Sequence, residues 1–388
     1  MTTHSALVEL ARRVPKADLH CHLIGTIRPQ TAAELARRHG IKFPEEPEHF
    51  YSRINSPPPE IPVANTAVPL PTPTPTTVGY SLLGVSEWIA DVLVDPSDFA
   101  QVAYEAAQDA FQQSNVRHLE LHFEVGAYLA RGIGYKTIAD GLADGLDAAA
   151  SELGTSARLI AGIDRSKSGA WGTAVVQEVI DYPTSYVVGV GLDNLETAGP
   201  PEQFADAYAL ARRHGLHRTA HAGEHAPTAR NVLSCLEVLN CQRIDHGYFV
   251  LEDMDVVTRM RDSGVPFTCI FTTSRRSWRS WRRESIRWMA ALGLPIVLAS
   301  DDPALFPTTL SDEYAIAVDV LDASAHLLID LARRSLAAAW LDDDAKRSML
   351  NEFEIESSEL RQRLGIAEPK GEQLRQPIPP QSAQEGTP

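Results

Sequence analysis

Short apolar runs alternate with longer segments of helical period along most of the chain, and no other feature constrains the fold as strongly. This alternation is typical of repeated βα units, in which parallel strands form a sheet that helices cover. The apolar runs predict eight strands, at residues 17–21, 118–123, 158–163, 186–192, 217–221, 243–246, 265–271 and 296–300. Eight such units predict an α/β fold, a (β/α)8 TIM-type barrel. Single barrels reach the 388 residues of this chain once they carry insertions.

Residues at helix boundaries support the alternation. Pro201 opens a segment that runs to Arg213, and Gly215 follows its end, which matches the preference for proline in the first turn and glycine past the last. Further helices are predicted over about 97–114 and about 284–292, and a short amphipathic helix near the N-terminus.

Two segments fall outside the alternation. Residues 44–77 are dense in proline and end in a Pro-Thr repeat, which predicts an extended, polyproline-like insertion after the first βα unit. Residues 368–388 are polar and rich in proline and glutamine, which predicts a disordered tail. We therefore expect one barrel domain over residues 1–367, with the insertion at about 44–77.

Charge and composition exclude several classes of partner. The formal net charge of −16 opposes both nucleic acid and an anionic membrane surface. No apolar run approaches the roughly 20 residues that span a bilayer, and the N-terminus lacks the pattern of a secretory signal. The four cysteines form no CxxC pair and no disulfide framework. These features predict a cytoplasmic protein without a nucleic-acid or membrane partner.

Ionisable residues gather at the ends of the predicted strands. In a parallel barrel the loops that follow the strands converge on one rim, where active sites lie. The predicted first, fifth, sixth and eighth strands end on or next to His20 and His22, His221 and Glu224, His246, and Asp301 with Asp302. We expect these side chains to meet at that rim.

His20 and His22 are two residues apart on a strand, so their side chains leave the same face and can bind one ion, while Cys21 points the other way. With His221 and Asp301 they make three imidazoles and one carboxylate. This set suits Zn²⁺, with Fe²⁺, Mn²⁺ or Co²⁺ as alternatives, and a barrel rim leaves room for a water ligand. Capping of a following helix by Asp301 is the competing interpretation, but it does not explain the histidines.

Four motifs resemble those of the adenosine/adenine deaminase family. The segment from Lys16 to Pro29, KADLHCHLIGTIRP, resembles its first-strand signature, and HAGE at 221–224 is similar to its catalytic turn. DHG at 245–247 and SDDP at 300–303 resemble its remaining motifs, and all occur in family order within about residues 7–345. The signature of the unrelated cytidine-type zinc deaminases is absent.

The resemblance implies hydrolytic deamination of an adenine-type base or nucleoside, a small-molecule substrate, by a zinc-held hydroxide, with release of ammonia. It implies one zinc ion per chain, held by His20, His22, His221 and Asp301. Glu224 would protonate the ring nitrogen beside the attacked carbon, for which its carboxyl group must stay protonated near neutral pH. His246 would orient or deprotonate the water, and Asp302 would hold another ring nitrogen.

The residues that contact the substrate are less defined by the sequence. Gly25 and Gly223 would let the substrate approach the backbone, or are simple turn glycines. Ile24 stands where members that act on adenosine often carry an aspartate that meets the ribose. After the fourth strand, one of three residues would touch the far edge of the base, or the loop is solvated; they are Asp193, Asn194 and Glu196.

The segment after the predicted seventh strand, FTTSRRSWRSWRR at 271–283, departs from the Cys-Pro-x-Ser-Asn of the family. Arg275 or Arg276 could bind a phosphate or carboxylate, which would suit a phosphorylated or N6-modified adenine nucleoside. For most of these arginines we favour a solvated loop, with Trp278 and Trp281 packed on the barrel.

Two other function classes compete with a deaminase. Amide or ester hydrolases of the wider metal-dependent barrel superfamily often bridge two metals with a modified lysine, but no lysine ends the predicted fourth strand. A non-enzymatic barrel that binds a nucleoside would be expected to have lost a ligand or Glu224, and this chain retains them all.

Overall fold

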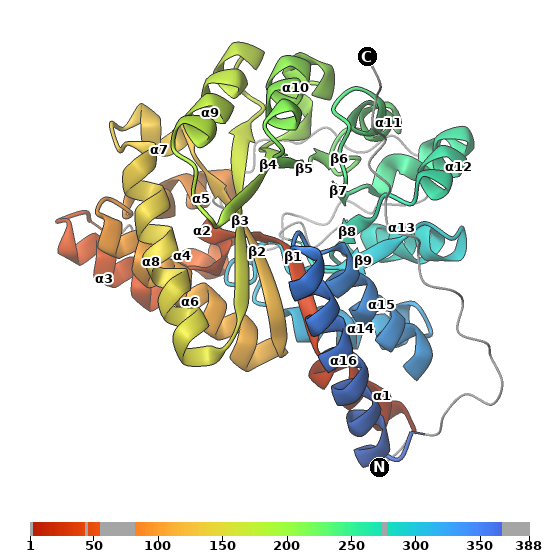
Figure 1. Cartoon of the computed structure of the whole chain (residues 1–388). Coiled ribbons are helices and arrows are strands. Elements are labelled where there is room, and N and C mark those ends of the chain that lie inside the picture. Colours follow the sequence, from red (N-terminus) through yellow and green to blue (C-terminus); the bar gives the residue numbers. More distant parts are fainter. Residues whose placement is uncertain (1–2, 43–45, 55–81, 274–277, 367–388) are drawn as a thin grey trace.

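The protein is described here from a computed structural model, which covers residues 3–42, 46–54, 82–273 and 278–366. Its strands run parallel and surround a central axis (Figure 1). Two sheets have the orders β1-β2-β3-β4-β5 and β6-β7-β8-β9. The strands are β1 (Lys16–His22), β2 (Val116–Glu124), β3 (Ser156–Asp164), β4 (Val187–Asp193), β5 (His217–Arg218), β6 (His221–Ala222), β7 (Ile244–His246), β8 (Phe267–Cys269) and β9 (Ile296–Leu298).

Backbone hydrogen bonds join the two sheets into a closed barrel. The strands β5 and β6 are the two halves of the predicted fifth strand, and between them the Thr219 amide donates to the Val190 carbonyl of β4 at 3.0 Å. At the other seam the His22 amide donates to the Asp301 carbonyl at 2.8 Å, and the Asp301 amide to the His20 carbonyl at 2.9 Å. The predicted (β/α)8 barrel is confirmed.

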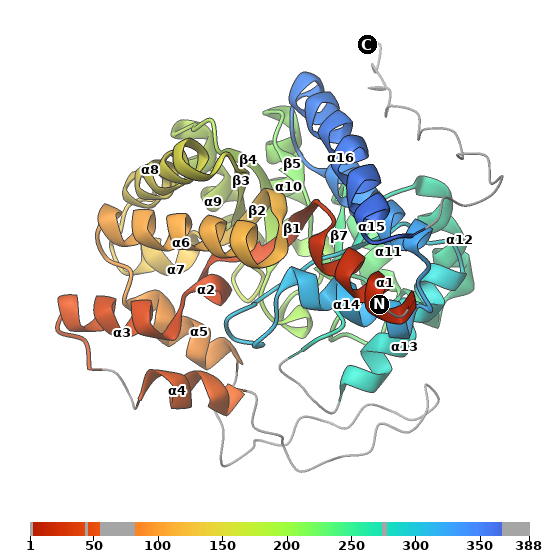
Figure 2. The ribbon, with the colours of Figure 1, turned by 90° about the horizontal axis from the view of Figure 1, so that it is seen from below.

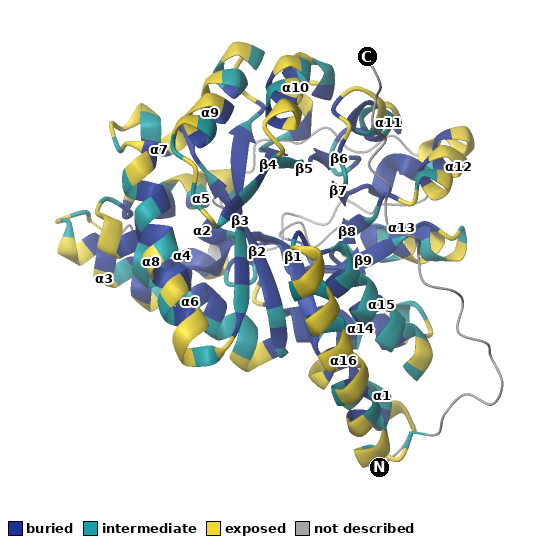
Figure 3. Cartoon of the chain, viewed as in Figure 1, coloured by how far each residue is buried: buried dark blue, intermediate teal, exposed yellow. Residues whose placement is uncertain are grey.

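Helices surround the barrel and bury their inner faces against it, while their outer faces are exposed (Figure 3). The helices are α1 (Thr3–Arg13), α2 (Leu23–Thr26), α3 (Pro29–Arg38), α4 (Pro47–Ile54), α5 (Leu82–Asp91), α6 (Pro96–Ser114), α7 (Gly126–Ala130), α8 (Tyr135–Leu153), α9 (Gly169–Asp181), α10 (Ala205–Arg213), α11 (Arg230–Glu237), α12 (Met254–Ser263), α13 (Arg279–Ala291), α14 (Leu310–Val320), α15 (Ala325–Ala338) and α16 (Asp343–Arg363).

Local sequence explains why α6 begins where it does. Its first residue is Pro96, and the side chains of Asp95 and Asp98 form a reciprocal capping box with the backbone amides of the first turn. None of the helices in the described residues is long and apolar enough to cross a membrane.

The prediction of an extended segment over residues 44–77 is wrong for Pro47–Ile54, which form α4. This helix buries Phe50, Tyr51 and Ile54, and the Tyr51 hydroxyl donates to the Ile27 carbonyl at 2.9 Å. Tyr51 and Ile54 lie one and four residues after Phe50, which places all three on one helical face. This helical pattern outweighs the preference of the surrounding prolines for an extended chain. The α3, α4 and α5 helices lie together beside α2 and α6 (Figure 2). Residues 55–77 and the predicted tail lie outside the described residues.

Strand β8 is shorter than the predicted 265–271 because side chains replace its strand partners. The Ile270 amide donates to the Tyr248 hydroxyl at 3.1 Å, and the Phe271 amide donates to the Glu313 carboxylate at 2.6 Å. The chain after β8 is therefore fixed by buried polar side chains.

A buried ion pair closes the amino end of the barrel. Glu120 of β2 lies 2.5 Å from Arg243, accepts the Trp340 amide at 2.6 Å, and is fully buried. The Arg243 guanidinium stacks 3.9 Å above the centre of the Trp340 ring. The opposite, carboxyl end of the strands carries the histidines and carboxylates of the four sequence motifs.

Candidate active site

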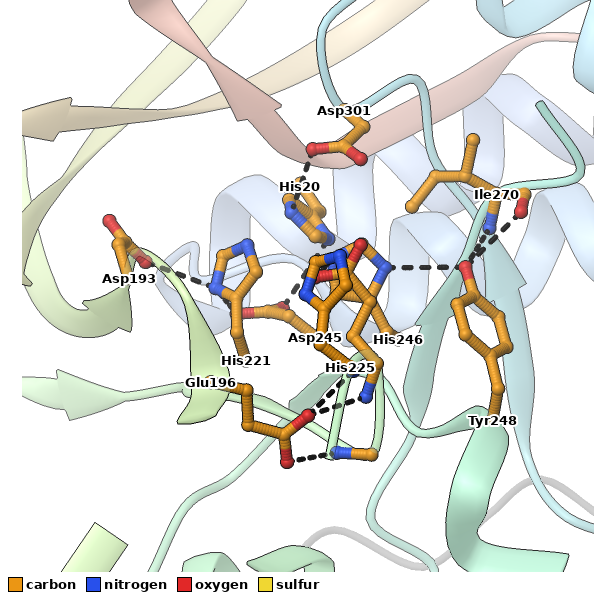
Figure 4. A network of polar contacts seen from close by, with 12 residues as sticks. His20, Asp193, Glu196, His221, His225, Asp245, His246, Tyr248, Ile270 and Asp301 are labelled. Atoms are coloured by element: carbon orange, nitrogen blue, oxygen red, sulfur yellow. Dashed lines mark hydrogen bonds and ion pairs between the residues drawn. The ribbon is translucent and has the colours of Figure 1, made fainter. Parts of the chain in front are cut away.

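Four of the predicted strand-end residues come together at the carboxyl ends of the strands (Figure 4). His20 from β1, His221 from β6, His246 from β7 and Asp301 after β9 are buried, and their potential ligand atoms all lie within 4.8 Å of one another. His22, also from β1, is half-buried and joins the same cluster.

The spacing of the predicted ligand atoms suits a tetrahedral zinc ion. His22 Nε2 lies 3.1 Å from His221 Nε2 and 3.5 Å from Asp301 Oδ1, and His20 Nε2 lies 3.4 Å from the same oxygen. Tetrahedral zinc with bonds of about 2.0–2.1 Å sets its ligand atoms about 3.3 Å apart. The four predicted ligands therefore fit the ion, and His246 is a further imidazole at the same place.

The charge states of His22 and Asp301 also suit a metal. Burial lowers the pKa of His22 to about 3, and the neighbouring His221 and His122 act in the same direction. Burial raises the pKa of the Asp301 carboxyl, but the imidazoles around it outweigh burial and hold the pKa well below its usual range. The buried His20 Nε2 makes no hydrogen bond among the described residues. A neutral imidazole and a carboxylate are the forms that bind metal.

The charge state of His221 differs from that of His22. Burial lowers the pKa of His221, but Asp193, Asp245 and Glu224 outweigh burial and raise this pKa to about 10. His221 would therefore lose a proton on binding the ion.

Unusual backbone conformations aim two of these side chains. His246 and Asp301 have φ values of 73° and 62°, in the left-handed region that residues other than glycine seldom adopt. Such strained positions cluster at functional sites.

Gly25 allows a close approach within the protein itself. A Cβ atom there would lie 2.2 Å from Asp302 Oδ1, so only glycine leaves room for the Asp302 side chain. Burial raises the pKa of Asp302 well above its usual range, with a contribution from the Asp301 charge. Gly223 has a φ of 67° and is a turn glycine between His221 and Glu224.

Carboxylates behind the histidines fix their orientation. Asp193, at the end of β4, lies 3.1 Å from His221 Nδ1. Asp245 accepts hydrogen bonds from the Thr268 and Thr219 hydroxyls at 2.9 and 2.8 Å, and Thr268 Oγ1 lies 2.9 Å from His20 Nδ1. Partners of this kind hold a ligand histidine in one tautomer.

Glu224 is surrounded by cationic and imidazole groups. Its Oε1 lies 3.0 Å from Arg282 Nη2, and its Oε2 lies 2.8 Å from His225 Nδ1 and 3.5 Å from His246 Nε2. Burial raises the pKa of Glu224, but His225, His246 and Arg282 outweigh burial and hold the pKa well below its usual range. These neighbours therefore favour the carboxylate form of Glu224, contrary to the expectation that the surroundings keep it protonated.

The preferred interpretation of the arginine-rich segment is wrong at Arg282. This side chain is 1% exposed, whereas a solvated loop was expected. The tryptophans do pack as predicted: the Trp281 ring lies tilted against Phe249 and edge-on to Trp278, at ring-centre distances of 4.6 and 5.7 Å. Arg275 and Arg276 lie outside the described residues.

Glu196 is neither in a solvated loop nor at the metal cluster. Its carboxylate is 2% exposed and accepts hydrogen bonds from four consecutive backbone amides, of Gly223, Glu224, His225 and Ala226, at 2.7–2.9 Å. Asn194 has a φ of 78° and donates to Asp164 at 3.0 Å. Nothing in the local sequence reveals that Glu196 supports the turn over residues 223–226.

Two residues of β2 also face the site and were missed. His122 is buried 3.4 Å from Asp193 Oδ1, and Glu124 lies two residues further along the same face. Their alternation with apolar neighbours in the predicted strand was the signal that could have identified them.

Comparison with known proteins agrees with this geometry. Residues 15–57 and 80–355 match the model of the adenosine deaminase family. The adenine deaminase of Cupriavidus taiwanensis is 32% identical, over 91% of this chain and 95% of the relative.

Solved structures with a similar fold include an amidohydrolase and an adenine deaminase. An amidohydrolase from Burkholderia ambifaria with bound Zn has a TM-score of 0.81 and 29% identity, over 95% of this chain and 96% of that one. The adenine deaminase of Arthrobacter aurescens has a TM-score of 0.77 and 29% identity, over 89% of this chain and 99% of that one. With motifs, fold, site and relatives in agreement, this chain belongs to the adenosine deaminase family.

Proposed function

We propose that this chain is a zinc-dependent hydrolase that removes the 6-amino group of adenine and releases ammonia. The observation that carries the proposal is the convergence of Glu224 and His246 on a cluster with zinc-ligand spacing. An acid and a base beside a metal site are what hydrolytic deamination of a purine ring requires.

We assign His20, His22, His221 and Asp301 as the residues that would hold one zinc ion per chain. When bound, zinc would supply a Lewis acid that lowers the pKa of a coordinated water to about 7. The zinc-containing relative from Burkholderia ambifaria supports this choice of metal.

His246 and Glu224 would move the protons. Burial holds the pKa of His246 well below its usual range, so its imidazole is neutral and can accept a proton from the attacking water. Glu224 begins as a carboxylate 3.5 Å from His246 Nε2, and a small shift of either side chain would bring the two within the about 2.6–3.2 Å over which a proton passes. It then gives a proton to the ring nitrogen beside the attacked carbon. The water's second proton leaves with the amino group as ammonia.

Asp302 would orient the ring. Burial and the Asp301 charge raise the pKa of its carboxyl group well above the usual range. This favours the protonated form, which can donate a hydrogen bond to a ring nitrogen that carries a lone pair. Gly25 contributes by leaving room for this side chain.

Carboxyl groups around the site favour an uncharged base over a nucleotide. Glu124, Asp164 and Asp193 end the neighbouring strands β2, β3 and β4. Burial raises the pKa of Glu124, and the charges of Asp193 and Asp164 raise it further, so these groups already repel one another. A phosphate placed here would add to that repulsion. The adenine deaminases among the relatives support the same choice.

Purine metabolism in the cytoplasm is the proposed setting. All four cysteines are buried free thiols, which suits a reducing compartment. We also propose that residues 1–367 form one barrel domain, which the family match over residues 15–57 and 80–355 supports.

The test is to measure zinc content and to follow ammonia release and ultraviolet absorbance with adenine, adenosine, AMP and N6-methyladenine. We expect one zinc per chain and the highest kcat/KM with adenine. The Glu224→Gln variant serves as the control and should keep its zinc but lose about 10³-fold in kcat. Zinc-loaded protein that releases no ammonia from any of these purines would exclude the proposed function.

A further inference from the structure

Arg282 is a buried arginine next to the proposed acid. It lies on α13, and its Nη2 is 3.0 Å from Glu224 Oε1, while its side chain is 1% exposed. Solvent and salt therefore screen this ion pair far less than a surface pair.

The remaining contacts of Arg282 lead to the proposed base. Its Nη1 donates to the Thr272 carbonyl at 3.3 Å, and its guanidinium lies 4.7 Å from the centre of the Tyr248 ring. The Tyr248 hydroxyl lies 3.2 Å from His246 Nδ1 and donates to the Ile270 carbonyl at 3.1 Å. Arg282 thus touches both Glu224 and the tyrosine that supports His246.

We propose that Arg282 is a positioning residue for deamination, which holds Glu224 Oε1 so that Oε2 faces His246 and the substrate ring. This inference rests on the proposed function, because it assigns a partner to the proposed acid. The two Glu224 oxygens have separate partners: Arg282 lies on Oε1, while His225 and His246 lie on Oε2. A carboxylate held at one oxygen keeps the other in a fixed direction.

A purely structural role does not account for this arginine. Its Nε makes no hydrogen bond among the described residues, and apart from Glu224 its partners are one carbonyl and one aromatic ring. Burying a guanidinium with so few acceptors costs stability. Among the described residues, Glu224 is the one oppositely charged partner in contact with this guanidinium.

The positive charge of Arg282 is permanent, unlike that of the two histidines beside Glu224. A guanidinium remains charged at every working pH, whereas an imidazole gains and loses its proton near neutrality. Arg282 therefore gives Glu224 a permanent cationic partner on α13, separate from the imidazole of His225 on its own turn and that of His246 on β7.

A kinetic double-mutant cycle tests the proposal with adenine as substrate. We expect Arg282→Met to lower kcat about 10²-fold with KM within about threefold, since misplacing a catalytic group by about 1 Å has an effect of this size. Arg282→Lys should recover part of the loss. In the Glu224→Gln background, Arg282→Met should lower kcat no further, because the arginine acts through Glu224.

The exposed Arg287 lies on the same helix and provides the matched control: Arg287→Met removes the same charge and should leave kcat unchanged. Zinc content should be equal in all variants. Wild-type kcat in Arg282→Met, or the same fold-loss with and without Glu224, would overturn the proposal.

Urea unfolding of the wild type, Arg282→Met, Glu224→Gln and the double variant tests the contact between Arg282 and Glu224 independently of any reaction. The shifts in unfolding midpoint from Arg282→Met and Glu224→Gln should be strongly non-additive. Arg282→Met leaves the Glu224 carboxylate without its guanidinium partner, and Glu224→Gln leaves the buried Arg282 guanidinium without its carboxylate partner. Additive shifts would overturn the inference even if no purine were turned over. Failure of ammonia release in the wild-type protein would instead exclude the proposed function.

Discussion

Glu196 lies beneath Glu224, and its carboxylate accepts the Glu224 backbone amide at 2.9 Å. The same carboxylate accepts the amides on either side, so one side chain fixes the backbone from Gly223 to Ala226, the segment that carries the proposed acid. The position of Glu224 is therefore set twice, through its backbone by Glu196 and through its side chain by Arg282.

We expect Glu196→Gln to destabilise the protein and to lower kcat. The amide nitrogen of glutamine would face backbone N–H groups as a second donor, and hydrogen bonds to a charged group contribute about 1.5–3 kcal/mol each. The free energy of unfolding should fall by about 3 kcal/mol, measured with urea, and kcat by at least about tenfold. Glu237→Gln, a change in an exposed ion pair, is the control and should alter neither. A wild-type kcat in Glu196→Gln would contradict this role.

The barrel and the metal cluster could be predicted because their signals are local. The apolar runs and helical periods each lie within one element, and His20 with His22 share a face through their spacing alone. Convergence of the strand ends follows from the geometry of any parallel barrel.

The supporting residues could not be predicted because their partners are distant and aperiodic. Glu196 contacts residues 27–30 positions away, and Arg282 reaches Glu224 across 58 positions. Both contacts depend on how segments that are distant in the sequence pack over the end of the barrel, and residue spacing within one element does not indicate that packing. The pKa of Glu224 is lowered, against the effect of burial, by His225, its neighbour in the sequence, and also by the distant His246 and Arg282.

Removing the carboxylate behind His221 should weaken zinc binding. Asp193 lies 3.1 Å from His221 Nδ1, and loss of such a partner lowers metal affinity by about 10–100-fold. We expect Asp193→Asn to lose zinc to a chelator at a correspondingly lower concentration. Asp164→Asn is the control, because Asp164 contacts Asn194 and the Ser166 amide rather than a histidine of the cluster. Equal zinc affinity in the two variants would show that Asp193 does not support the ligand.

A methyl group at Gly25 should disturb the site without reaching the substrate. In Gly25→Ala the new Cβ would lie 2.2 Å from Asp302 Oδ1 and 2.5 Å from Asp302 Cα, so both side chain and backbone must move. Because Asp301 adjoins Asp302, we expect lower zinc content and a fall in kcat of about 10²-fold. Gly134→Ala is the comparison, since nothing lies within 4 Å of a Cβ there. Wild-type zinc content and kcat in Gly25→Ala would show that the site tolerates the shift.

The buried ion pair at the amino end of the barrel should control acid stability. Burial raises the pKa of Glu120, but Arg243 and His118 outweigh burial and lower it to about 2. Because this pKa is below that of the unfolded chain, the pair stabilises the fold above about pH 4.5, and the stabilisation is lost as pH falls toward 2.

Glu120→Gln leaves Arg243 buried and uncompensated, so unfolding at neutral pH should cost about 3–5 kcal/mol less. The variant should also show a shallower loss of stability between pH 5 and 2, measured by urea unfolding at each pH. Glu356→Gln, which breaks the more exposed pair with Arg117, should change stability by about 1 kcal/mol or less. Identical pH slopes in wild type and Glu120→Gln would mean that other carboxylates govern acid unfolding.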